Sequence, residues 1–171
     1  MKMESIEIPW FDSDSSKLRK ILFLIISVLP ISFLMKFVSE WTHEFLGHCG
    51  IGFLVGGQPI NYYVSWFWPL EFGYAIVVFP IGASNISRAL MAGGGILTCL
   101  IAAISSNIAI YYILKKRAIK SSMVFITLHA LFWYGFWAFM NSTGYLLIGS
   151  FLNFGDIGLI ALACRHWTTT S

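Results

Sequence analysis

Two histidines and a glutamate stand close together in the sequence WTHEFLGHCG, residues 41–50. In the HExxH motif of zinc enzymes the two histidines are four residues apart on one face of a helix. Both can then bind one Zn²⁺, while the adjacent glutamate acts as a general base. Here His43 and His48 are five residues apart, which places them about 140° apart around a regular α-helix. A shared metal therefore requires an irregular helix or another set of ligands.

Two local arrangements would restore a metal site. A π-bulge between His43 and His48 would absorb the extra residue, and such bulges are frequent at functional sites; Gly47 would give the backbone freedom there. Alternatively, Glu44 and His48 form the ligand pair, and His43 supports a ligand or transfers protons. We favour the bulge because it leaves Glu44 free to activate water. The competing interpretation is that these are ordinary polar residues at the end of an amphipathic helix.

A catalytic zinc site also needs a third protein ligand and an open position. Asp156 is the first candidate, because it lies between two glycines in the last apolar segment, where an uncompensated carboxylate would be costly. A helix-terminal or interfacial aspartate is the alternative. His129 is the reserve candidate, and its alternative role is an interhelical hydrogen bond. The other histidines and carboxylates beyond the first twenty residues are Glu40, Glu71 and His166.

The chain as a whole is strongly apolar. Of its 171 residues 57% are hydrophobic and only 11% are charged, with a mean hydropathy of +0.75, whereas soluble domains are about half apolar and a quarter charged. The composition therefore predicts an integral membrane protein in contact with lipid. Ionisable groups inside membrane segments tend to mark functional sites, which favours the chemical interpretation. The net charge of +3 is small, and we expect no nucleic-acid partner.

Apolar segments predict an all-α polytopic membrane protein with about four transmembrane helices. The first segment, from Ile21 to about Gly57, is far longer than the roughly 20 residues that cross a bilayer; one helix bent at Pro30 and two shorter helices both remain open. The other segments cover about 88–114, 123–140 and 144–164. Residues 58–87, rich in aromatic and β-branched types, predict an interfacial extended or hairpin segment between the first and second helices.

We divide the chain into a tail or interfacial lead-in (1–20), one membrane-embedded helical domain (21–165) and a C-terminal tail (166–171). Basic residues lie before the first segment and after the second, which predicts that these ends are cytoplasmic. With four crossings, both termini would be cytoplasmic. Three widely separated cysteines, Cys49, Cys99 and Cys164, are expected to be reduced apolar residues.

Three motifs together resemble the site-2 protease family of membrane-embedded zinc metalloproteases. They are HEFLGHCGIGFLVGG in the first segment, ALMAGGGILTCLIAA opening a later one, and GYLLIGSFLNFGDIG in the last, within roughly residues 30–160. That family places HExxH in one core helix, an aromatic or extended loop after it, a small-residue motif opening the next core helix, and an LDG-type aspartate on a later helix. This chain differs in its histidine spacing, in the Phe-Gly-Asp-Ile-Gly context of Asp156, and in lacking the usual proline and asparagine of the middle motif.

The resemblance implies that His43, His48 and Asp156 bind one Zn²⁺ per chain and that Glu44 is the catalytic base. The implied substrate is a transmembrane protein segment cut within or near the bilayer, and residues 58–87 would offer an extended edge to it. The alternative function is a non-catalytic subunit that keeps the helical core and packs in a larger membrane complex. Small residues at 92–95 and at Gly144, Gly149 and Gly155 suit close helix packing within the chain or with a partner. A third possibility is metal binding or transport without hydrolysis.

Overall fold

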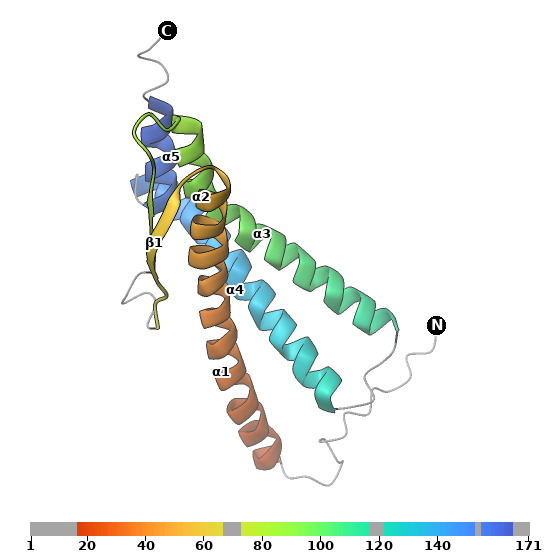
Figure 1. The fold of residues 1–171 in the computed structure, drawn as a ribbon. Coiled ribbons are helices and arrows are strands. Elements are labelled where there is room, and N and C mark those ends of the chain that lie inside the picture. Colours follow the sequence, from red (N-terminus) through yellow and green to blue (C-terminus); the bar gives the residue numbers. More distant parts are fainter. Residues whose placement is uncertain (1–16, 67–72, 117–121, 153–154, 166–171) are drawn as a thin grey trace.

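The computed structural model describes residues 17–66, 73–116, 122–152 and 155–165, and these are mostly helical (Figure 1). The helices are α1 (Lys17–Trp41), the π-helix η1 (Thr42–Gly50), α2 (Ile51–Leu54), α3 (Asn85–Lys115), α4 (Ser122–Leu152) and α5 (Gly155–Arg165). The strands are β1 (Gln58–Tyr63) and β2 (Tyr74–Val78). Most of the N-terminal tail and the whole C-terminal tail lie outside the described residues.

The first apolar segment is one continuous helix made of α1, η1 and α2. It passes through Pro30, which lies inside α1, so the alternative of two separate short helices is wrong. The helix ends at Leu54 in a turn where Gly56 has a φ of +88° and the Gly57 N–H donates to the Gly52 carbonyl oxygen over 2.8 Å. Glycine adopts this left-handed conformation without steric cost, which confirms the expected stop at Gly56 and Gly57.

Three helices within the described ranges are long and apolar enough to cross a membrane: 25–54, 85–115 and 123–152. The third predicted segment ends at Met140, but α4 continues to Leu152. The predicted fourth segment is therefore split between the end of α4 and α5. With 11 residues, α5 is about 16 Å long, too short for a hydrocarbon core of about 30 Å, and a fourth crossing is not confirmed.

The predicted hairpin between the first and second membrane helices is confirmed. Strands β1 and β2 pair antiparallel, from Gln58 opposite Val78 to Tyr63 opposite Tyr74, with an irregularity between Pro59 and Asn61. Figure 1 shows the hairpin beside η1 and α2, at the same end of the bundle as α5. The hairpin, η1 and the start of α5 therefore meet in one region.

Buried positions are polar or small, whereas large apolar side chains cover the outside of the long helices. The largest fully buried side chains are His43, Cys99, Ser39, Ser65 and Ser142. Burial of leucine side chains away from lipid contributes no hydrophobic free energy, because lipid tails are as apolar as leucine. Helices in a membrane are therefore held together by close packing and hydrogen bonds. In Figure 1 the long helices meet near the hairpin and spread apart toward the Lys17 and Lys115 ends. The polar interior therefore coincides with the region where the elements converge.

Glycines allow η1 and α3 to touch backbone to backbone. A Cβ atom on Gly47 would lie 2.5 Å from the Cα of Gly95, and a Cβ on Gly94 would overlap the Gly47 carbonyl oxygen. Gly93 faces the other way, toward Ile160 of α5. The small residues of the middle motif therefore serve packing within the chain and hold α3 between η1 and α5.

Candidate metal centre

The π-helix brings His43 and His48 onto one face. In a π-helix each hydrogen bond spans five residues, so residues five apart lie nearly above one another. The two Nε2 atoms are 3.2 Å apart, and both side chains are buried. The predicted π-bulge is thus confirmed as a nine-residue π-helix, Thr42–Gly50.

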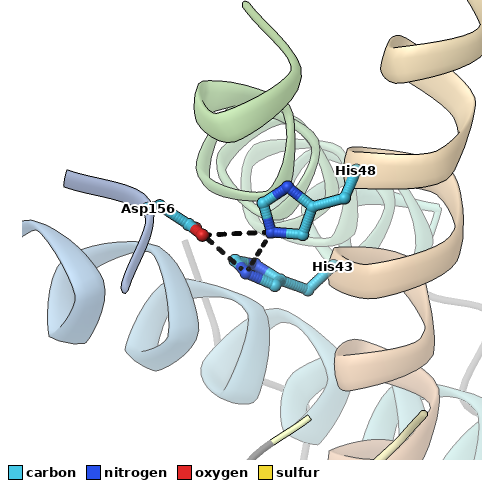
Figure 2. A group of neighbouring side chains, drawn as sticks. All are labelled: His43, His48 and Asp156. Atoms are coloured by element: carbon cyan, nitrogen blue, oxygen red, sulfur yellow. Dashed lines mark hydrogen bonds and ion pairs between the residues drawn. The ribbon is translucent and has the colours of Figure 1, made fainter. Parts of the chain in front are cut away.

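Asp156 completes the group from the first turn of α5. The chain turns into this helix at Gly155, whose φ is +62°. Figure 2 shows the carboxylate directed at both imidazoles, with Oδ1 3.1 Å from Nε2 of His48 and Oδ2 3.2 Å from Nε2 of His43. One ligand atom from each residue lies within 4.8 Å of the others. This buried group of two nitrogens and one carboxylate could hold a metal ion.

Two observations show that the group fits a cation. The Oδ2 atom of Asp156 is buried and makes no hydrogen bond, although it lies close to His43. A buried carboxylate oxygen without a partner is costly unless its charge is compensated. The two Nε2 atoms also face each other, and one proton at most can be shared between them. Three donor atoms that converge in this way match the three protein ligands of a catalytic zinc site.

The outward-facing nitrogens of both imidazoles are held by further groups. His48 Nδ1 lies 2.9 Å from the carbonyl oxygen of Met91, which can only accept, so Nδ1 carries the proton. His43 Nδ1 lies 3.7 Å from Cys99 Sγ, and that thiol donates to the carbonyl oxygen of Ser39 over 3.9 Å. Such contacts fix the tautomer that leaves Nε2 free for a metal.

Gly95 and Tyr145 shape the space around His43. A Cβ on Gly95 would lie 2.5 Å from His43 Cε1, 2.6 Å from His43 Nε2 and 2.7 Å from His48 Nε2. The ring of Tyr145 stacks on the His43 ring, with centroids 4.6 Å apart and an interplanar angle of 10°. The sequence gives little sign of either role, because Gly95 looks like any packing glycine and Tyr145 like one aromatic residue among many.

Glu44 lies beside this group without belonging to it. Its side chain is buried and interacts electrostatically with His48 and Asp156. A Cβ on Gly73 would lie 2.9 Å from Glu44 Oε1, so the backbone just before β2 covers the carboxylate. Within the described ranges the converging ligand atoms are those of His43, His48 and Asp156. Glu44 is therefore not among the converging ligands, in contrast to the alternative in which Glu44 and His48 form the ligand pair.

The remaining candidates lie elsewhere. His129 on α4 accepts a hydrogen bond from Trp133 Nε1 over 3.3 Å and stacks on Phe125, and it lies outside the candidate ligand group. Glu40 forms an ion pair with Lys36. Glu71 and His166 lie outside the described residues.

Comparisons of the chain with family models, with curated proteins and with solved structures found no match. The resemblance to the site-2 protease family therefore depends on the motifs themselves. The geometry adds that the residues which those motifs single out, His43, His48 and Asp156, meet in one buried group.

Proposed function

We propose that this chain is a membrane-embedded zinc metalloprotease that hydrolyses peptide bonds of membrane-segment substrates. The observation that carries this proposal is the π-helix, which directs His43 and His48 to Asp156 while Glu44 stays outside the ligand group. A general base next to three convergent ligands, inside an apolar helical protein, is what hydrolysis near the bilayer requires. Two nitrogens and one carboxylate form a ligand set typical of catalytic zinc.

In the proposed reaction the chain's own residues bind, orient and transfer protons. When bound, Zn²⁺ supplies Lewis acidity that acidifies water and polarises a carbonyl group. Glu44 accepts the proton of the attacking water and then donates it to the leaving amine. Burial of Glu44 between η1 and the backbone at Gly73 limits its rotation and keeps its carboxylate close to the ligand group.

The hairpin beside the site supports a substrate that binds as an extended chain. Peptides commonly bind by adding a strand to a free sheet edge, and the described sheet has two strands. We expect proline at Tyr63 or Val64 to slow cleavage, because it would disturb this end of β1. Unchanged cleavage by both variants would contradict strand addition while leaving the metal site unaffected.

A cleavage assay with the base removed tests the proposed activity. The zinc-loaded protein is reconstituted in liposomes with a pool of synthetic single-span peptides, and new termini are detected by mass spectrometry. Glu44→Gln keeps the size of the side chain and removes the base, so it should retain zinc and slow cleavage by about 10²- to 10⁴-fold. Equal cleavage by wild type and Glu44→Gln would rule out the mechanism.

The non-catalytic subunit remains the alternative proposal. The small residues suit packing within the chain or with a partner; Gly94 and Gly95 pack against η1 and Gly93 faces α5, whereas the space around Gly144 is open. Metal binding without hydrolysis predicts zinc retention with no cleavage by either protein in the same assay, which separates it from the protease.

Three candidate membrane helices in place of the four predicted spans would change the expected orientation. The basic residues at the Lys17 and Lys115 ends still predict that this end of the bundle is cytoplasmic. A cytoplasmic C-terminus requires a further crossing, and α5 is too short to provide one. Figure 1 places the Arg165 end of α5 opposite the Lys17 end of α1, so we propose that the two ends lie on opposite sides of the membrane.

A further inference from the structure

A second buried charged group lies on α1, one helical turn before Glu44. Lys36 and Glu40 are 8% and 7% exposed, and Lys36 Nζ lies 3.0 Å from Glu40 Oε2. Charged side chains inside membrane segments are costly and usually functional. A buried ion pair by itself rarely stabilises more than apolar residues of the same size would. We therefore expect the Lys36–Glu40 pair to have a role other than stabilising α1.

Lys36 also reaches across to the hairpin. Its Nζ donates a hydrogen bond of 2.8 Å to the carbonyl oxygen of Ser65, which is fully buried just after β1. On either side of Ser65, Val64 is buried and the Trp66 ring stacks on Phe37 with centroids 4.3 Å apart. Ser65 and Trp66 are thus both held on α1, and Lys36 supplies a polar contact to this segment.

This attachment lies next to the proposed base. Tyr63, two residues before Ser65, pairs with Tyr74 on β2. Gly73, the residue before Tyr74, lies so close to Glu44 that a Cβ atom on Gly73 would be 2.9 Å from Glu44 Oε1. The same Cβ would lie 3.1 Å from the Tyr63 carbonyl oxygen. The end of the hairpin therefore cannot move toward η1 without meeting Glu44, and Lys36 keeps it from moving away.

The position of the hairpin also sets the width of a groove. An apolar groove of about 490 Å³ lies between η1 and β1, with Phe45 and Cys49 on the helical wall and Ile60 and Tyr62 on the strand wall. Because β1 forms one wall, any displacement of the strand changes the space between them.

We propose that Lys36 is a positioning residue that holds the β1–β2 hairpin against Glu44 and so sets the width of this groove. Glu40 keeps the ammonium group in place through the one-turn ion pair, a spacing that suits such contacts. The consequence for the substrate rests on the proposed function, whereas the attachment of the hairpin does not.

Hydrogen–deuterium exchange of the full chain in lipid nanodiscs tests the attachment directly. Lys36→Met alone would leave Glu40 without its cation, so the main variant is Lys36→Met/Glu40→Gln, which removes both charges. Hairpin amides at 58–66 and 73–78 should exchange about tenfold faster, because opening loses a hydrogen bond from a charged donor. Amides of α3 and the zinc content should stay as in wild type.

Two results would overturn the inference. The first is unchanged hairpin exchange in the double variant. The second is faster exchange throughout the helices together with zinc loss, which would mean that the pair holds the helical core. Lys36→Arg is the matched control: arginine keeps the positive charge and can still donate to Ser65 and Glu40, so hairpin exchange should remain close to wild type.

Cleavage kinetics then separate this inference from the proposed function. If peptides are cleaved, the double variant should raise KM, because the groove changes, and should also lower kcat, because the hairpin no longer confines Glu44. Lys36→Arg should leave both constants close to wild type. An unchanged KM in the double variant would contradict the link to substrate binding. If wild type cleaves nothing, the proposed function fails, and the exchange result still decides the role of Lys36.

Discussion

Gly95→Ala is the smallest change that should disable the metal centre. The new methyl carbon would lie 2.5 Å from His43 Cε1, 2.6 Å from His43 Nε2 and 2.7 Å from His48 Nε2. Ordinary contacts begin at 3.4 Å. The shortest contact is therefore 3.4 − 2.5 = 0.9 Å too close, and the imidazoles or α3 must move by roughly that much.

Such a displacement exceeds what a metal site tolerates, since ligand distances vary by only about 0.2 Å. We expect zinc affinity to fall at least about 100-fold, which corresponds to about 2.8 kcal/mol. The assay is competition for zinc between the detergent-purified protein and a chromogenic chelator. Overpacking should also lower the free energy of unfolding by about 1–3 kcal/mol, which thermal unfolding of the metal-free protein measures separately.

Gly93→Ala is the matched control, because it adds the same methyl group to the same helix two residues away. Its Cβ would meet Ile160 Cδ1 at 3.6 Å, an ordinary contact, so its zinc affinity should match wild type. Equal affinity in Gly95→Ala and wild type would refute the placement of the ligands around Gly95. Equal loss in both variants would mean that any methyl group here disturbs α3.

Further predictions concern the support of His43, the helix crossing and the orientation. Cys99→Ala should weaken zinc binding about 10- to 100-fold, as changes next to metal ligands do. Cys99→Ser should keep most of the wild-type affinity, because a hydroxyl group also donates and accepts hydrogen bonds. Equal zinc affinity in wild type and both variants would contradict the role of the thiol. Gly47→Ala, whose Cβ would lie 2.5 Å from Gly95 Cα, should destabilise the protein by about 1–3 kcal/mol. Gly144→Ala, whose Cβ would lie in open space, should leave the free energy of unfolding unchanged. Unfolding in detergent compares the stabilities of the two variants. Reporter fusions at the Lys17 and Arg165 ends should label opposite sides of the membrane, and labels on one side would show a fourth crossing.

The ligand group could be predicted because its residues are chemically rare in this chain. Only four histidines and eight carboxylates occur, so the histidine pair and a carboxylate between glycines are conspicuous in apolar segments. The five-residue spacing itself indicated a π-bulge, because that deviation restores a shared face. The hairpin was visible in its aromatic and β-branched composition.

Other features depend on contacts between distant elements. The predicted segments 123–140 and 144–164 left residues 141–143 between them, but Ser142 and Thr143 donate to the Phe139 carbonyl oxygen within α4, and Asn141 donates to Ser39 of α1. Because these side chains form hydrogen bonds within α4 or with α1, the polar residues do not end the helix. The space left by Gly95 and the reach of Lys36 to Ser65 follow from helix packing, which no local pattern encodes.

The metal content of the purified protein tests the central claim most directly. Elemental mass spectrometry would compare wild type with His48→Ala, Asp156→Ala and, as a histidine control away from the site, His129→Ala. We predict about one zinc per chain in wild type and His129→Ala, and loss of zinc in the other two. Wild-type protein that binds no metal after zinc loading, or His48→Ala and Asp156→Ala variants that keep it, would contradict the metal centre.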